Sequence, residues 1–313
     1  MSAVPATPDM RTSLPRGVWR YVIRNAWVTG VIVLLILMIF EQRRASPAWS
    51  EFDMQTLAIG AVPLAFAAMG QAVIIIGGGV DLSLGNQMAL VSVIAVSGVP
   101  DIVVTLATSF IWLGVALYVL GFPGGGVPLE FSNLASLNTV QSTWPNRSEL
   151  IPYPEYIPIS IVILLIIFLA VWIPISRTRM GLSFYAIGSS KNAAYLAGID
   201  VRRAKVLSYA VGGIFTGCAG LALTATTGIG DANTGAVGNY TLNSVAAVVL
   251  GGVSLAGGIG GLFGPLVGAF VLELVSTILL LHEVDPNWAQ VIQGSLIIIV
   301  VAVGGLLLLR RKA

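Results

Sequence analysis

Residues 177–205 read RTRMGLSFYAIGSSKNAAYLAGIDVRRAK, and this basic segment decides how the rest of the chain is arranged. It separates two apolar runs, residues 157–176 and 206–227, each of which is long enough to cross a hydrocarbon core of ~30 Å as a helix. The basic segment contains six Lys and Arg residues and one acid, Asp200. Because short loops rich in Lys and Arg are retained in the cytoplasm, we expect the basic segment on the cytoplasmic side of a membrane.

The basic segment also carries signals for internal structure. Residues 192–197 favour a short helix, Gly198 can adopt the left-handed conformation that ends it, and Asp200 can cap the next helix. A helix, a glycine break and a second helix would form a rigid projection from the membrane part of the protein. The residues alone leave two interpretations open: an amphipathic segment that lies on lipid headgroups, or a docking element for another protein.

Composition places the chain among integral membrane proteins. Apolar residues make up 56% and charged residues 10% of the sequence, against ~25% charged residues in an average soluble domain, and the mean hydropathy is +0.91. Cys218 is the single cysteine, which excludes an intrachain disulfide and a cysteine-rich metal site. The net charge of +2 reflects the cytoplasmic bias of Lys and Arg and does not indicate a nucleic-acid partner.

The apolar runs predict an all-α fold, a polytopic membrane helix bundle of about eight crossings with one additional partial helix. The first run is not followed by a small-residue cleavage site, so we expect a retained helix rather than a removed signal peptide. The partial helix is expected at residues 82–97. The expected crossings are residues 18–40, 57–76, 101–121, 157–176, 206–227, 241–256, 266–281 and 288–309.

This arrangement puts both termini in the cytoplasm. Thirteen of the 16 Lys and Arg residues then lie on the cytoplasmic side, which decides the expected orientation. The expected domains are a cytoplasmic tail at residues 1–17, a transmembrane domain at residues 18–309 and a cytoplasmic tail at residues 310–313. External connections are expected at residues 41–53, 122–156, 228–240 and 282–286.

The second crossing runs into a glycine-rich motif that contains an acid, residues 77–85, which read GGGVDLSLG. Three consecutive glycines cost roughly 1 kcal/mol each relative to alanine in a helix interior, so we expect the helix to break here. Asp81 follows, and an acid at the centre of a membrane helix costs ~2.5 to 3.5 kcal/mol. Two compatible roles remain open: Asp81 caps the helix at residues 82–97 together with Ser83, or unwound backbone lines a polar pathway.

Two sharper chemical hypotheses concern the second half of the chain. Glycine-rich residues 257–265 lack the lysine and the hydroxyl residue of a nucleotide-binding P-loop, so no ATPase is expected in this chain. Ser254 and His282 could form an intramembrane serine protease only if they lay within hydrogen-bond reach of each other. The alternative is that Ser254 is a packing hydroxyl and His282 a residue of a surface turn.

Glu273 is a second acid inside an expected crossing, and we expect it to face a helix partner or a polar cavity rather than lipid. Asp81 and Glu273 together would suit an ion-coupled secondary transporter, which is a competing function for the chain. Gly213, Gly217 and Gly220 form a small-residue face for close helix contact, inside the chain or between chains.

Three motifs carry a family resemblance, in this order: GGVDLSLG at residues 78–85, AIGSSKNAAYLAGI at residues 186–199 and AAVVLGGVSLAGG at residues 246–258. From about residue 57 to its C-terminus, the chain resembles the permease subunits of bacterial ABC sugar importers of the ribose type. The resemblance implies a multi-pass protein of the cell inner membrane that translocates a monosaccharide or a related small polar solute. It implies no catalytic residue, metal or cofactor in this chain, because a separate subunit binds and hydrolyses ATP.

The resemblance also implies partners and site residues. The expected partners are a cytoplasmic ATP-binding subunit, a periplasmic sugar-binding protein, a second permease copy or paralogue that completes a dimer, and the lipid bilayer, with no nucleic acid. The basic segment is similar to the family segment that docks on the ATPase, and its docking candidates are Ala186, Gly188, Asn192, Ala193, Ala194, Gly198 and Ile199. The candidates for the translocation pathway are Gly79, Asp81, Ser83, Asn86, Thr241 and Asn243.

The sequence departs from the family pattern in two places. Members usually carry another ~40 residues, about two crossings, between the Asp81 motif and the segment that matches residues 102–108. Here only residues 86–101 lie between them. Thr241 and Asn243 stand where members often have acidic residues, which we expect to alter the external mouth.

Overall fold

The computed structural model describes residues 26–44, 51–82, 101–119, 121–122, 124, 159–229 and 234–285, together with six residues between 288 and 298. Every element in this part of the chain is a helix, which confirms the predicted all-α fold. The elements are α2 (Ala26–Arg44), α3 (Glu51–Ile76), α5 (Asp101–Val119), α8 (Ile159–Ile167), the π-helical turn η2 (Phe168–Trp172), α9 (Ile173–Ser176), α10 (Arg179–Ser189), α11 (Lys191–Leu196), α12 (Val201–Thr227), α13 (Thr234–Leu250) and α14 (Phe263–Leu281).

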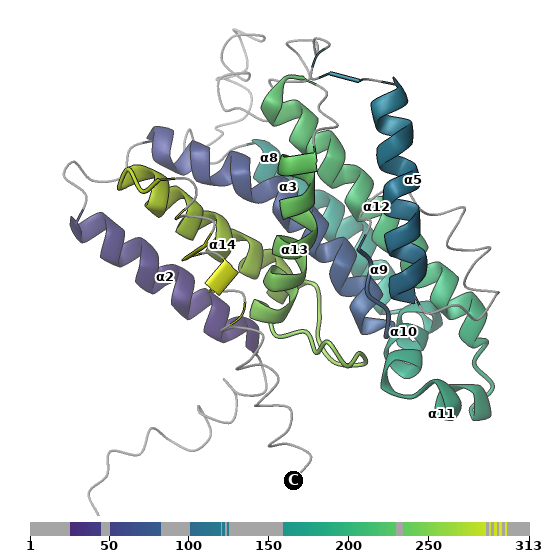
Figure 1. Cartoon of the computed structure of the whole chain (residues 1–313). Coiled ribbons are helices and arrows are strands. Elements are labelled where there is room, and N and C mark those ends of the chain that lie inside the picture. Colours follow the sequence, from purple (N-terminus) through teal and green to yellow (C-terminus); the bar gives the residue numbers. More distant parts are fainter. Residues whose placement is uncertain are drawn as a thin grey trace, which may run out of the picture.

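The central helix of the bundle is α3 (Figure 1). Its residues 61–76 are mostly apolar and buried on all sides, as expected for a helix that is surrounded by others. The helices α12, α13 and α14 pack against it. The contact with α12 is close, because a β-carbon added at Gly70 would lie 2.7 Å from the carbonyl oxygen of Gly212. Small residues thus let these two helices approach each other.

Two helical stretches in the described part of the chain are long and apolar enough to cross a membrane, Thr56–Ile76 and Val201–Thr227. A third results if the bent pair Ser160–Ser176 and Arg179–Ser189 counts as one span. The total of about eight crossings therefore stays a prediction. The partial helix at residues 82–97 and most of the last crossing lie outside the described residues.

The predicted external turn at residues 41–53 is wrong at both ends. The helix α2 continues to Arg44 and α3 already begins at Glu51. Glu41 is only 1% exposed, and its Oε1 atom lies 3.5 Å from Nδ1 of His282, the first residue after α14. A carboxylate with a partner at a neighbouring helix end can stay buried, whereas hydropathy alone ends the helix at the first charge.

Two boundaries in the second half also differ from the prediction. The turn expected at residues 228–240 is right only at its start, because Gly228 ends α12 in the left-handed conformation but α13 already begins at Thr234. The crossing expected at residues 241–256 ends at Leu250, where two glycines turn the chain. The first turns of α13 are polar, and the turn after it is rich in small apolar residues. Hydropathy therefore places both ends of this helix too late.

The contact of α12 with α3 uses a glycine outside the predicted small-residue face. Gly212 makes the contact with α3, whereas a β-carbon added at Gly217 or Gly220 would meet nothing within 4 Å. Within the part of the chain that the structure describes, these two glycines make no close helix contact. A contact between chains at this face stays a prediction.

Candidate functional site

The basic segment consists of short helical pieces that begin at polar caps. After α9 the chain bends by 76° into α10. The side-chain oxygen of Thr178 caps α10 by accepting a hydrogen bond from the N–H of Gly181 at 3.4 Å. Ser190 caps α11 in the same way, by accepting from the N–H of Ala193 at 3.3 Å. Each cap satisfies an amide that has no partner within its own helix.

The predicted end of α11 and the predicted cap of the next helix are both confirmed. Gly198 has a φ of +79°, and its N–H donates to the carbonyl oxygen of Tyr195 at 2.9 Å. Asp200 then accepts a hydrogen bond from the N–H of Arg203 at 3.0 Å. Because α12 begins at Val201, the long helix starts inside the basic segment rather than after it.

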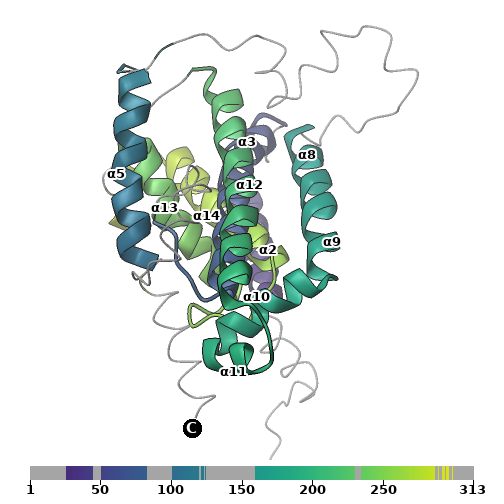
Figure 2. The same cartoon turned by 90° about the vertical axis from the view of Figure 1, so that its right-hand side faces the viewer.

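A small apolar core holds these pieces together. Ile187 of α10, Ala194 of α11 and Ala204 of α12 form one buried cluster, and Ala186 and Ile199 pack against it. The docking candidates Ala186, Ala194 and Ile199 thus stabilise the segment from inside. Figures 1 and 2 show α10 and α11 together at one end of the bundle. With its caps and its core, the basic segment is a folded projection at one end of the bundle, and its rigidity stays a prediction.

The outer surface of the projection exposes two large apolar side chains that the sequence analysis missed. Tyr195 and Leu196 of α11 are 73% and 84% exposed. The docking candidates Asn192, Ala193 and Gly198 are exposed on the same short stretch. The available signal was two bulky apolar residues in a short helix that is otherwise made of small or polar residues.

Behind the projection, three backbone segments meet in what we call the glycine junction. They are residues 76–78 at the end of α3, residues 188–189 at the end of α10, and residues 257–260 in the turn before α14. Each segment contains part of one of the three family motifs. Motifs that are far apart in the sequence therefore come together at one place in the fold.

The segments of the glycine junction touch through their backbones. The N–H of Gly258 donates to the carbonyl oxygen of Ile76 at 3.0 Å. A β-carbon added at Gly257, where φ is +83°, would lie 3.0 Å from Cα of Gly78 and 2.9 Å from the carbonyl oxygen of Gly188. Such distances are shorter than ordinary van der Waals contact, so this turn has no room for a side chain.

The docking candidate Gly188 lies at the centre of the glycine junction rather than on the outer surface. A β-carbon added there would overlap the carbonyl oxygen of Ile76 and lie 2.6 Å from the nitrogen of Gly258. One turn earlier, the hydroxyl of Tyr185 donates to the carbonyl oxygen of Gly260 at 3.0 Å. Burial raises the pKa of the Tyr185 phenol above its ordinary value, which keeps the hydroxyl a donor.

The candidates for the translocation pathway lie on two neighbouring elements. Gly79 and Asp81 follow α3 and are buried, with Asp81 4% exposed. Thr241 and Asn243 are half-buried on α13, which packs against α3. The predicted capping role of Asp81 stays a prediction, because the helix it would cap is not among the described residues. The candidates Ser83 and Asn86 also lie outside them.

Gln71 is a buried polar residue that the sequence analysis missed. It lies on α3, is 0% exposed, and neither polar atom of its amide has a hydrogen-bond partner among the described residues. An unpaired buried polar group costs ~1 to 3 kcal/mol. Its signal in the sequence was a single amide within a run of apolar and small residues. We therefore add Gln71 to the candidates for the pathway.

The geometry rejects the serine protease hypothesis. Ser254 precedes α14 and His282 follows its last residue. A helix of 19 residues is about 28 Å long, so the two side chains lie at opposite ends of it and are far beyond hydrogen-bond reach. Ser254 instead accepts a hydrogen bond from the N–H of Ala256 at 3.2 Å, within the turn before α14.

Glu273 faces a helix partner, as predicted. A β-carbon added at Gly60 of α3 would overlap the Glu273 carboxylate. Gly60 lies about 24 Å along α3 from Ile76, the end that leads into Asp81, which argues against one ion site shared by both acids. Within the described ranges, no group of three or more His, Cys, Asp or Glu side chains could hold a metal ion.

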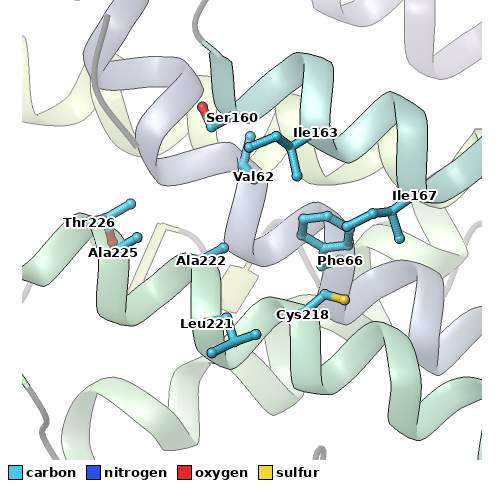
Figure 3. A pocket seen from close by; sticks show the side chains of 10 residues that line it. All are labelled: Val62, Phe66, Ser160, Ile163, Ile167, Cys218, Leu221, Ala222, Ala225 and Thr226. Atoms are coloured by element: carbon cyan, nitrogen blue, oxygen red, sulfur yellow. The ribbon is translucent and has the colours of Figure 1, made fainter. Parts of the chain in front are cut away.

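A cavity of about 170 Å³ lies between α3, α8 and α12 (Figure 3). Val62 and Phe66 line it from α3, and apolar side chains of α8 and α12 complete the wall. Figure 3 shows the hydroxyls of Ser160 and Thr226 toward one end of this lining. A wall made almost entirely of carbon atoms offers few hydrogen-bond partners to a hydroxylated solute, so we do not assign the pathway to this cavity.

Known proteins with similar sequences are transporter permeases. The probable ABC transporter permease protein YphD of Escherichia coli is 28% identical, and the alignment covers 100% of this chain and 98% of that protein. The ribose import permease protein RbsC of Bacillus subtilis is 30% identical over 75% of this chain and 79% of its own length. The galactose/methyl galactoside import permease protein MglC of Haemophilus influenzae is 35% identical over 46% of this chain and 42% of its own length. No solved structure matches the chain.

The alignment with YphD bears on the predicted shortening of this chain. It spans 347 positions against the 313 residues of this chain, which leaves 34 positions at which only the relative has a residue. This number is close to the ~40 residues, about two crossings, that the family resemblance predicts to be missing, and their place after the Asp81 motif stays a prediction.

The family is shown by a match that covers more than half of the chain. Residues 91–301 match the model of a family described as the permease component of the branched-chain amino acid transport system. The relatives named above carry permease names as well, which confirms the resemblance to ABC permeases. This protein therefore belongs to that family of transport-system permease components.

Proposed function

We propose that this chain is the membrane-spanning subunit of an ATP-driven importer for a monosaccharide or a related small polar solute, and that its basic segment docks on a cytoplasmic ATP-binding subunit. A periplasmic solute-binding protein and a second permease copy or paralogue complete the assembly. Both termini lie in the cytoplasm. The observation that carries the proposal is the folded, capped projection that exposes Tyr195 and Leu196.

The exposed surface of α11 suits a protein partner. Tyr195 and Leu196 are large exposed apolar side chains, and the same basic segment carries the exposed cations Lys191, Arg202 and Arg203. Protein interfaces commonly combine apolar or aromatic anchors at the centre with a polar rim. A segment adapted to lipid headgroups would need neither three polar caps nor a core of its own, so the docking interpretation is favoured over the interfacial one.

The mechanism requires no bond chemistry in the membrane. Closure of the ATP-binding subunits would move the projection as a rigid body, and the helix bundle would alternate between outward and inward openings. ATP can shift this equilibrium only if the subunits contact the projection differently in the two states. The residues of this chain therefore act by binding, positioning and hydrogen bonding.

The names of two relatives support a small hydroxylated solute. One is a ribose import permease and the other a galactose/methyl galactoside import permease. In this chain, Gln71, Asp81, Thr241 and Asn243 offer polar groups on the adjacent elements α3 and α13 and the segment that follows α3. A few such polar groups in an otherwise apolar setting fit recognition of a small polar molecule.

The first experiment measures uptake of labelled ribose and galactose by cells that express the permease with its ATPase and binding protein. We expect uptake to survive collapse of the ion gradients and to stop when the ATPase is inactivated by mutation. The opposite pattern would replace the ABC proposal with the ion-coupled secondary transporter.

A second experiment tests the docking of the basic segment. Gly198→Val places a branched side chain at a φ of +79°, which costs about 1 to 3 kcal/mol and distorts the end of α11. We expect weaker co-purification with the ATP-binding subunit and normal membrane insertion. Gly114→Val on α5 is the control, because a β-carbon there meets nothing within 4 Å. Unchanged co-purification of the Gly198 variant would show that the projection is not the contact.

A further inference from the structure

We infer that the glycine junction is the joint through which the projection moves the segment that leads to Asp81, so that Gly188 and Tyr185 are positioning residues for transport. The inference rests on the proposed docking of the ATP-binding subunit. It goes beyond that docking, because it names the internal route by which a displacement of the projection reaches the candidate pathway.

At the glycine junction, α10 and α3 meet through backbone atoms alone. Gly188 at the end of α10 lies directly against the carbonyl oxygen of Ile76, with no side chain between them. A contact between two side chains can absorb a displacement by a rotamer change, but a contact between two backbones cannot. Since packed protein interiors are hardly compressible, a shift of α10 must shift the end of α3.

Two hydrogen bonds hold the turn before α14 in place. Its Gly258 N–H donates to the carbonyl oxygen of Ile76, and its Gly260 carbonyl accepts from the hydroxyl of Tyr185, both at 3.0 Å. One bond therefore joins the turn to α3 and the other joins it to α10. The turn therefore links the projection to the central helix beside their direct contact.

The glycine junction holds the residue that leads to the Asp81 segment. This residue, Ile76, is the last of α3, and Asp81 follows five residues later. The long helix α12 also leaves the projection, and it packs along α3 from Gly70 to Gly77, where a β-carbon would lie 2.9 Å from the Ser208 hydroxyl oxygen. At this end of α3, α12 therefore makes contact through a side chain, whereas the glycine junction makes contact through backbone.

The test follows the Asp81 segment directly and needs no knowledge of the solute. Leu82→Cys introduces a single cysteine in a Cys218→Ser background, and the permease is assembled with its ATP-binding subunit. The rate of labelling by a water-soluble maleimide is measured with and without ATP and vanadate. In the unmodified junction we expect ATP to change this rate by roughly fivefold or more, the lower end of usual coupling between two sites.

Two variants then interrupt the joint. Gly188→Ala separates α10 from Ile76, and Tyr185→Phe removes only the hydrogen bond to Gly260. We expect both variants to bind the ATP-binding subunit and to support its ATP hydrolysis. The ATP-dependent change in the labelling rate should fall to less than about twofold for Gly188→Ala and by about half for Tyr185→Phe, on the scale of usual coupling factors. Gly114→Ala on α5 is the control, because a β-carbon there meets nothing within 4 Å, and it should keep the full change.

The outcomes separate the inference from the proposed function. Failure of the unmodified permease to bind the ATP-binding subunit would reject the proposed function itself. Two results would overturn the inference but leave the proposed function intact. One is that the unmodified permease binds the ATP-binding subunit and supports hydrolysis without any ATP-dependent change in labelling at position 82. The other is that the junction variants show the same change in labelling as the control. If Gly188→Ala does not accumulate in the membrane, Tyr185→Phe decides, because it adds no atom to the joint.

Discussion

The two faces of the basic segment are built on different principles. The inner face meets α3 and the turn before α14 through the backbones of Gly188 and Gly258, where a side chain has no space. The outer face presents Tyr195 and Leu196, whose side chains are mostly exposed. The inner face thus depends on the absence of side chains, and the outer face depends on their chemistry.

This difference predicts which changes each face tolerates. Any added carbon should damage the inner face, because the obstacle is backbone that cannot move aside. Replacement of the exposed side chains Tyr195 and Leu196 should leave folding intact and change only the binding of a partner. The changes below test that division, in order of expected effect.

The largest effect is expected at the turn of the glycine junction. Gly258→Val adds a branched side chain at a φ of +70° and next to the backbone of Ser189. Strain and overpacking together should cost about 3 kcal/mol or more in the free energy of unfolding. The measurement is the thermal midpoint of the purified permease in detergent, together with its yield.

A matched control for this change lies three residues away in the same turn. A β-carbon at Gly261 would meet nothing within 4 Å. Gly261→Val should therefore lower the free energy of unfolding by less than about 1 kcal/mol, as is usual for a site without steric conflict. Equal damage by the two variants would mean that the turn is sensitive to substitution in general, and the contrast between the two faces would lose its basis.

The next largest effect concerns binding by the outer face. Replacing both Tyr195 and Leu196 by Ser should leave the thermal midpoint unchanged, because both side chains are exposed. If they anchor the ATP-binding subunit, its dissociation constant should rise roughly 30-fold, the value of a loss of about 2 kcal/mol at an interface anchor. The measurement is binding of the ATP-binding subunit to the permease in nanodiscs.

The control for the outer face is an equally exposed residue elsewhere. Tyr118 at the end of α5 is 90% exposed, and Tyr118→Ser should leave the dissociation constant within about twofold, as expected for a residue outside the interface. A double variant of the outer face that binds as tightly as this control would assign Tyr195 and Leu196 to the lipid surface instead.

The two faces also differ in how far the sequence predicts them. Local signals identify the projection: Gly198 ends α11 and Asp200 caps α12 because each acts on residues within four positions of itself. The break after Ile76 follows in the same way from its three glycines. The glycine junction, by contrast, joins residues that are about 70 to 180 positions apart, and no local rule brings Ile76, Gly188 and Gly258 together.

The difference between local signals and contacts of distant residues also explains the errors in the helix boundaries and in the assignment of site residues. Hydropathy ends a helix at a charge or a polar run, so it misses the buried Glu41 at the end of α2 and the polar first turns of α13. The docking candidates taken from the motif divide into residues that support the projection, such as Ala194, and residues that it exposes, such as Asn192. Only the fold distinguishes the two groups.

A smaller effect on stability is expected at a third kind of environment, a buried side chain without a partner among the described residues. Gln71→Leu removes an unpaired amide, so the free energy of unfolding should stay equal or rise, by up to about 1 to 3 kcal/mol. If Gln71 binds the solute, the KM for uptake should rise roughly tenfold, the value of one lost hydrogen bond. Uptake kinetics of the sugar that the unmodified permease transports provide the measurement.

The outcome at Gln71 distinguishes a role in solute binding from a structural role, which the fold alone does not distinguish. Destabilisation of the Leu variant would show that the amide has a structural partner, and Gln71 would leave the list of pathway candidates. Glu is not a useful replacement, because a buried carboxylate carries a large cost of its own. The variant Gln71→Ala serves as a further comparison: a loss of stability with an unchanged KM would assign the position to packing.

The smallest effect is expected where the projection continues into α12. Asp200 accepts from the N–H of Arg203 and also lies 3.0 Å from its Nε, but both side chains are largely exposed, and exposed ion pairs contribute little. Asp200→Ala should therefore cost about 1 kcal/mol through loss of the cap, and amide exchange at Arg203 should become about fivefold faster. Asp200→Asn keeps an oxygen that can cap the helix and should leave exchange within about twofold. If Asp200→Asn accelerates exchange as much as Asp200→Ala does, the ion pair with Arg203 rather than the cap stabilises the start of α12. The stability of this helix start would then depend on charge, and hence on the salt concentration. The other two helix starts of the projection would differ from it, because they depend on the hydroxyl caps Thr178 and Ser190.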